Sequence, residues 1–169
     1  AIGREAGKNS QSRDAVSIGN YVDSGNSGGG QSNQGQHSIA IGTNSGSTNQ
    51  ATNSVSIGRD SGKNNQGSSA VSIGYGAGLT SQGANSLAIG EGSGKYHQGD
   101  YSVAIGQQCG QGDGTTDNQQ GTKSVAIGWT SGKINQGSES LAIGTSTGVN
   151  NQGANCIALG TRSGKESQG

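Results

Sequence analysis

The chain has 169 residues, of which 26% are hydrophobic, 3% are aromatic and 35 are glycine. Its 10 basic and 10 acidic residues cancel, which argues against nucleic-acid binding because that function needs a basic surface. No apolar run approaches the roughly 20 residues of a membrane-spanning helix, so we expect no membrane insertion in this segment. Low hydrophobicity often indicates disorder, but the few apolar residues keep a strict register, which favours an ordered fold.

A short repeat runs through the whole chain. It begins within one copy, at Ala1-Ile2-Gly3, and continues as a small–apolar–small–Ile–Gly pattern. Successive copies are 16 residues apart, apart from two longer intervals of 23 and 22 residues. After Ile2, the Ile position is filled in chain order by Ile18, Ile41, Ile57, Ile73, Ile89, Ile105, Ile127, Ile143 and Leu159. A constant short period is typical of a solenoid in which each unit contacts only its neighbours.

The first half of each unit alternates apolar and small residues, which predicts a short β-strand, and the Gly that follows predicts a corner. The expected strands cover 15–18, 38–41, 54–57, 70–73, 86–89, 102–105, 124–127, 140–143 and 156–159. We expect the large residues to point inward, so that the Ile column from Ile18 to Leu159 forms the core. The small residues between them then point outward and form a candidate lateral interface, made of Ala40, Ser56, Ser72, Ala88, Ala104, Ala126 and Ala142.

The second half of each unit always contains Gln at the same position, whereas the residues between the preceding Gly and this Gln vary freely. We expect a second strand there, with the amides stacked in a structural ladder along the rod, as in cross-β assemblies. The members of this candidate ladder are Gln50, Gln66, Gln82, Gln98, Gln120, Gln136 and Gln152. An exposed Gln stripe that binds a partner is the alternative.

These patterns predict an all-β fold, a parallel β-solenoid of about ten 16-residue coils in one repeat array over residues 1–169. The two longer intervals predict loop insertions within 20–34 and 107–120, where a rigid rod can carry function. The chain has no Met and starts within a unit, so we expect it to be a segment of a longer protein.

No catalytic, cofactor or metal site is expected, and we predict that the protein is not an enzyme. His37 and His97 are four units apart and lack ligands at metal spacing, and no Ser, His and acid occur as a set. Cys109 and Cys156 lie about three units apart, too far for a disulfide within the chain, and fall in columns of small residues. Packing is therefore their expected role.

Four copies carry a more specific hallmark, Asn53-Ser-Val-Ser-Ile-Gly58, Asn85-Ser-Leu-Ala-Ile-Gly90, Tyr101-Ser-Val-Ala-Ile-Gly106 and Lys123-Ser-Val-Ala-Ile-Gly128. At these residues the sequence resembles the head repeats of YadA-like trimeric autotransporter adhesins. Similar repeats occur in viral fibre and other surface fibre proteins. The resemblance implies a left-handed parallel β-roll with three chains around one axis. It also implies an extracellular location, at a cell surface or virion surface, and attachment to a host or matrix surface ligand.

Three functions fit the sequence: a structural fibre or filament subunit resembling an adhesin head, a viral fibre protein, and an ice-binding solenoid whose flat array would be the outward Ser and Ala columns. We favour the first, as a homotrimer or a longer filament. The apolar residues are too few to offset the conformational entropy of ordering a single chain, and the expected outward residues beside each Ile are small enough for close lateral packing.

Overall fold

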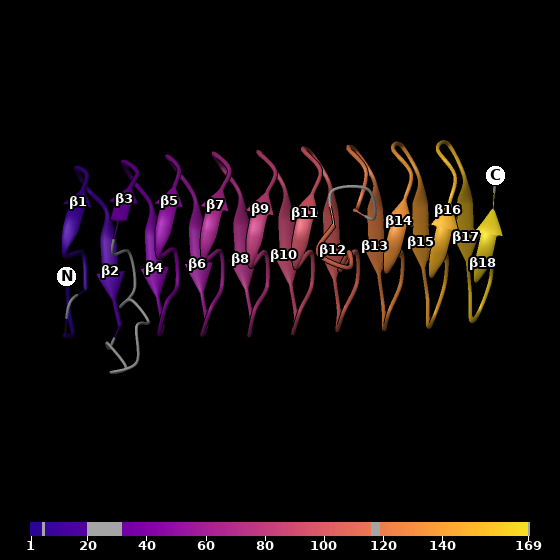
Figure 1. The fold of residues 1–169 in the computed structure, drawn as a ribbon, viewed down its shortest axis with the longest axis horizontal. Coiled ribbons are helices and arrows are strands. Elements are labelled where there is room, and N and C mark those ends of the chain that lie inside the picture. Colours follow the sequence, from indigo (N-terminus) through magenta and orange to yellow (C-terminus); the bar gives the residue numbers. More distant parts are fainter. Residues whose placement is uncertain (5, 20–31, 116–118, 169) are drawn as a thin grey trace.

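The computed structural model describes residues 1–4, 6–19, 32–115 and 119–168, and Figure 1 shows them as a straight stack of coils with the two termini at opposite ends. Most coils contribute one short strand to each of two facing series, without α-helix in the described ranges. The described residues therefore contain no helix that could span a membrane.

The first series is a continuous nine-stranded sheet, called here the first sheet. Its strands are β2 (Val16–Ile18), β4 (Ile39–Ile41), β6 (Val55–Ile57), β8 (Val71–Ile73), β10 (Leu87–Ile89), β12 (Val103–Ile105), β13 (Val125–Ile127), β15 (Leu141–Ile143) and β17 (Ile157–Leu159). These strands fall within the ranges that the apolar alternation predicts.

The second series, called here the second sheet, has a six-stranded and a three-stranded part. Its strands are β1 (Asn9–Gln11), β3 (Ser32–Gln34), β5 (Thr48–Gln50), β7 (Asn64–Gln66), β9 (Thr80–Gln82), β11 (Tyr96–Gln98), β14 (Ile134–Gln136), β16 (Asn150–Gln152) and β18 (Glu166–Gln168). Isolated bridges from Gln98 to Gln120 and from Gln120 to Gln136 connect the two parts.

All strand pairs are parallel, and each residue pairs with its equivalent in the next coil. Leu87 pairs with Val103 and Ile89 with Ile105 in the first sheet, and Gln66 pairs with Gln82 in the second. The parallel solenoid is thus confirmed, with about eight coils that carry both strands rather than ten. The coil that begins at Ile2 and the coil that contains Gln120 each have an isolated bridge in place of one strand.

A glycine at the end of each first-sheet strand makes the corner. At Gly90, φ is +121°, and an added Cβ would lie 2.5 Å from the carbonyl oxygen of Gly106 in the next coil. Both the backbone conformation and the stacking distance therefore require glycine. The small–apolar–small–Ile–Gly pattern ends where it does because no other residue fits this corner.

The interior of the coil is lined by small residues and glutamine, and this corrects the expected core. The residues between the two large ones of each strand, such as Ala88 and Ala104, are 0% exposed. The large residues of the Ile column lie on the outer side of the first sheet, half-buried in the middle of the stack and exposed at its end. Those wrongly assigned to the interior are Ile18, Ile41, Ile57, Ile73, Ile89, Ile105, Ile127, Ile143 and Leu159.

The reason for the reversal is the narrowness of the coil. An added Cβ at Gly94, on the opposite wall, would lie 3.3 Å from the Cβ of Ala88 and 2.5 Å from Oε1 of Gln98. A Gln side chain and one small side chain thus fill the cross-section of each coil. A branched Ile side chain would overlap these atoms, so only Ala or Ser fits on the inner side.

The two predicted insertions differ in how much of them the structure describes. Residues 20–31 of the first insertion lie outside the described residues. In the second, Asp113 lies in a turn, where its carboxylate accepts hydrogen bonds from the backbone N–H of Thr115 at 2.9 Å and from its Oγ1 at 2.7 Å. Residues 107–115 and 119–120 are described, and the second sheet resumes at Gln120.

Candidate functional site

The outer side of the first sheet carries a continuous apolar surface, which we call the apolar face. It consists of the first and third residues of strands β2, β4, β6, β8, β10, β12, β13, β15 and β17, all of them Val, Ile or Leu. Because pairing is in register, the face has two straight columns. Its terminal members Ile157 and Leu159 are 66% and 63% exposed, since no further coil covers them.

The lateral interface expected from the sequence is not at the molecular surface. The small residues assigned to that interface are buried inside the coil and are unavailable to a second chain. They are Ala40, Ser56, Ser72, Ala88, Ala104, Ala126 and Ala142, each 0% exposed. A sheet that presents Val, Ile and Leu to solvent over nine strands is instead the extended apolar surface of the described chain, and such surfaces mark interaction sites.

The Gln column lies inside the coil rather than on an exposed stripe. Its members from Gln50 to Gln152 are at most 2% exposed, and each Nε2 donates to a main-chain carbonyl of the first sheet. Gln82 donates to Val71 at 2.9 Å and Gln98 to Leu87 at 2.9 Å. The amides therefore tie the two sheets of one coil together. The sequence predicts hydrogen bonds from Gln to Gln along the stack. Among the described residues one such bond is found, from Gln66 Nε2 to Gln82 Oε1 at 3.3 Å.

A ladder along the stack does exist, but it is formed by Asn on the outer side of the second sheet. Asn33 donates to Asn49, and Asn49 to Asn65, each at 2.9 Å, and Asn135 donates to Asn151 at 3.0 Å. These residues directly precede the Gln column and have φ between +52° and +57°. The sequence signal that could have revealed them is the frequent Asn at this position, because Asn tolerates the left-handed conformation.

The Gln carbonyl oxygen has a hydrogen-bond donor in some of the described coils and lacks one in others. Ser56 donates to Gln66 Oε1 and Ser72 donates to Gln82 Oε1. Where the residue across the coil is Ala, as at Ala88 opposite Gln98, the buried Oε1 has no partner. The same holds for Gln50, Gln120, Gln136 and Gln152, and Gln34 Oε1 also lacks a partner although Ser17 occupies the inner column of its coil. A buried acceptor without a donor destabilises the fold.

Ala88→Ser should therefore stabilise the protein. A hydroxyl at this position reaches Gln98 Oε1 as Ser72 reaches Gln82, and serine fits the same column in three other coils, at Ser17, Ser56 and Ser72. We expect an increase of about 0.5–1.5 kcal/mol in the free energy of unfolding. Thermal and urea melts against the parent measure it, with Ser72→Ala as the converse control, which should lower stability. A parent-like or lower stability of Ala88→Ser would show that Oε1 is already satisfied.

A metal site would require several titratable groups of the described residues to lie together. No group of three or more His, Cys, Asp or Glu that could hold a metal occurs in the described ranges. His37 contacts the carboxylate of Asp14, whose Oδ2 lies 3.7 Å from His37 Nδ1. Burial raises the pKa of the Cys109 thiol, so this thiol is not activated as a nucleophile, and neither cysteine is in a disulfide. Cys109 is fully buried, as its expected packing role requires.

Asp60 lies at the turn between the two sheets and has three polar side-chain partners. Its carboxylate accepts hydrogen bonds from Asn44 Nδ2 at 2.9 Å and Arg59 Nε at 3.2 Å, and lies 3.3 Å from Lys63 Nζ. Burial alone would raise the pKa of Asp60, but the hydrogen bonds from Asn44, Lys63 and Arg59 and the charge of Lys63 outweigh it. The pKa therefore lies below its usual range, and Asp60 is ionised at neutral pH.

Comparison with known proteins gives one family. Residues 34–61 match the model for the YadA head domain repeat, in two copies. No curated protein and no solved structure matches the chain. The matched segment includes β4, β5 and β6, and the coils beyond it keep the same parallel register. The resemblance inferred from the sequence is thus confirmed: the chain carries YadA-like head repeats folded as a parallel β-solenoid, the type of repeat found in adhesin-like surface proteins.

Proposed function

We propose that this chain is a non-enzymatic, extracellular, adhesin-head-like fibre segment that assembles through its apolar face. The observation that carries the proposal is the location of the large apolar side chains. They lie outside the coil, half-buried in its central part, while its interior holds small residues and Gln. Folding of one chain therefore leaves the apolar face only partly covered, and burying its remaining exposed surface against other copies supplies further hydrophobic stabilisation.

A homotrimer is the assembly that the YadA-type repeat favours, with a longer filament as the alternative. Three rods lying side by side around one axis can each turn a flat, two-column face inward, which buries all three faces and leaves none for further growth. Closed symmetry of this kind limits the assembly to a fixed size. The second sheet, with its polar outer residues, then faces solvent.

The same repeat supports display at a cell surface more than at a virion surface, and attachment to a host or matrix surface ligand is the role that display would serve. The ice-binding alternative relied on an outward array of Ser and Ala. Those columns are inside the coil, so that array does not exist. A thermal-hysteresis assay checks this directly, and we expect no activity.

The test is the mass of the protein in solution. We expect light scattering at micromolar concentration to give three times the 16.6 kDa of one chain, with the same value on dilution to about 1 µM. Sedimentation equilibrium provides the second measurement. A stable, folded monomer of 16.6 kDa would refute the assembly, whereas a mass that grows with concentration would replace the trimer with the filament.

A further inference from the structure

A hollow of about 230 Å³ lies along the bend that leads from the first sheet into the second. It spans four consecutive coils, with Asp60 at one end and Gln108 at the other. Leu79 and Lys95 in its wall directly precede strands β9 and β11. None of its lining residues belongs to the apolar face, so a ligand in the hollow does not compete with assembly.

The hollow is lined by Gly76 and Gly92, which occupy the same position in two neighbouring coils. In other coils the same position holds Asn44, Asp60, Gln108, Thr130, Ser146 or Arg162, with φ between +52° and +58°. The values at Gly76 and Gly92, +62° and +63°, differ little, so the backbone accepts side chains here.

Packing does not require the two glycines either. An added Cβ at Gly76 would meet no atom within 4 Å, and at Gly92 the nearest atom would be 3.7 Å away. Side chains are thus missing in two neighbouring coils where both conformation and space would allow them. This absence creates the hollow, whose floor is main chain.

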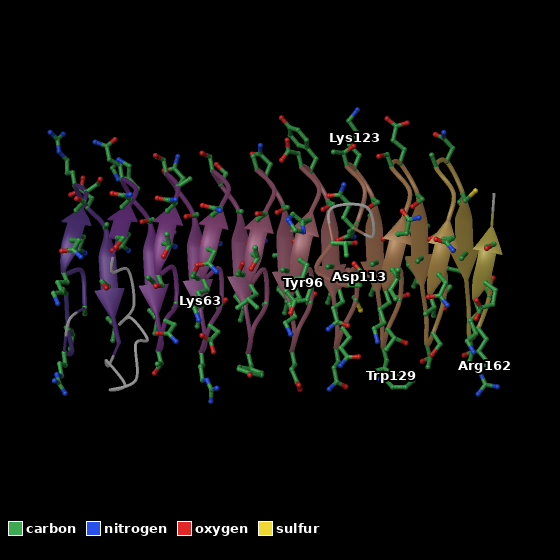
Figure 2. The ribbon with its side chains drawn as sticks, viewed as in Figure 1. Lys63, Tyr96, Asp113, Lys123, Trp129 and Arg162 are labelled. Atoms are coloured by element: carbon green, nitrogen blue, oxygen red, sulfur yellow. The ribbon has the colours of Figure 1, made fainter. Side chains whose placement is uncertain are left out.

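The walls carry charges of both signs in equal number. Asp60 and Lys63 contribute one pair at 3.3 Å, and Glu91 and Lys95 contribute the other carboxylate and ammonium group. Glu91 Oε2 accepts a hydrogen bond from Gln107 at 3.1 Å, and Lys95 Nζ lies 5.0 Å from the centre of the Tyr96 ring. In Figure 2, where the rod axis is horizontal, Lys63 and Tyr96 lie at a similar height, near the starts of second-sheet strands. The balanced charge favours neither an anion nor a cation.

The remaining wall combines apolar surface with groups that both donate and accept hydrogen bonds. Tyr75, 53% exposed with its ring 5.1 Å from the guanidinium carbon of Arg59, and Leu79 supply the apolar part. The amides of Gln108 and Gln111 supply donors and acceptors. A matching ligand is small, neutral and rich in hydroxyl groups, with one face of C–H bonds. These are the properties of a pyranose sugar.

We propose that the hollow between Gly76 and Gly92 binds a neutral sugar residue, free or within a glycan. The carboxylates of Asp60 and Glu91 accept from its hydroxyl groups, the Lys and Gln side chains donate to them, and Tyr75 and Leu79 contact its C–H face. The biological role rests on the proposed attachment function, since a glycan is then the surface ligand. The binding itself is a property of the rod.

The test fills the hollow without disturbing the coil. The double variant Gly76→Asn/Gly92→Asn places in both coils the residue that already occupies this column at Asn44. The control, Thr130→Asn/Ser146→Asn, introduces the same residue in the same column outside the hollow, at φ of +52° and +53°, in place of two hydroxyl side chains that contact each other at 3.1 Å. Circular dichroism and light scattering confirm that both variants keep the fold and mass of the parent.

Binding is measured by saturation-transfer NMR with the methyl glycosides of glucose, galactose, mannose and N-acetylglucosamine, each up to about 10 mM, which detects millimolar affinities. Phosphate and tetramethylammonium serve as charged comparators. We expect at least one methyl glycoside to bind the parent and the control variant, with its signal lost in the double Gly variant. Absence of binding by all four, binding retained in the double Gly variant, or binding of a charged comparator alone would overturn the proposal.

The same samples separate this proposal from the assembly. If the protein binds sugar but light scattering gives the mass of a monomer, the sugar site is supported and the trimer is refuted. A trimer that binds none of the four glycosides refutes the sugar site and leaves the assembly intact.

Discussion

Lysine at three positions of the apolar face should dissociate the assembly into single chains. In Ile57→Lys/Ile89→Lys/Ile127→Lys, the substituted residues lie in alternate coils, so the new charges do not adjoin one another within the sheet. Each replacement removes about 2 kcal/mol of apolar burial per chain and places a charge in the interface, so association should weaken by at least about 1,000-fold. Light scattering measures the shift from three chains to one.

The control for this variant carries the same charges on the other sheet. Thr48→Lys/Thr80→Lys/Ile134→Lys alters strands β5, β9 and β14, on the side that we place toward solvent. It should keep the parent mass. Far-ultraviolet circular dichroism follows the β-content of both. An Ile57→Lys/Ile89→Lys/Ile127→Lys protein with the parent mass would show that chains do not meet through the apolar face.

Ala88→Arg should abolish the fold, because it places a guanidinium group inside a coil that has no room for it. Ala88 is fully buried, and its Cβ would lie 3.3 Å from a Cβ added at Gly94 on the opposite wall. The one large side chain in the same cross-section is that of Gln98. Overlap and an unpaired buried charge together should cost more than about 4 kcal/mol. Thermal melting and limited proteolysis measure the loss.

Two matched variants locate the effect of Ala88→Arg. Ala88→Ser keeps the size of the side chain and should fold. Leu87→Arg introduces the same charge one residue earlier, on the outer side, and should lower the mass in solution while sparing the coil. If Ala88→Arg melted like the parent and Leu87→Arg unfolded, the inner and outer sides of the first sheet would be reversed.

Most of the backbone could be predicted from the sequence because period determines it. The alternation of apolar and small residues marks the strands, and the 16-residue period fixes their parallel register. The Gly that follows each Ile marks the corner. The number of complete coils is lower than expected because position in the repeat does not ensure a strand. Ile2 and Gln120 occupy repeat positions but form isolated bridges only.

The direction of each face could not be derived from alternation, since a strand with large and small residues on opposite sides fits either way. Apolar character alone favours an interior lined by Ile. The two sheets are so close, however, that only small residues such as Ala88 and Ser72 fit between them. The Gln column held the clue. A Gln side chain inside the coil leaves space only for a small residue opposite. The hollow also has a signal in the sequence, as Gly76 and Gly92 break a column that otherwise carries side chains.

The regular spacing of the apolar face has a consequence for alignment between neighbouring rods. Two faces with identical columns fit each other nearly as well after one rod slides along its axis by a whole coil, so axial slippage uncovers only the apolar surface of the end coils. A unique alignment requires a landmark that does not repeat. In the described part of the chain, the irregular coil between Gln107 and Gln120 is such a landmark, because it alone lacks a second-sheet strand among the coils from β2 onward. Shortening it to the 16-residue period would leave the rods free to associate out of step.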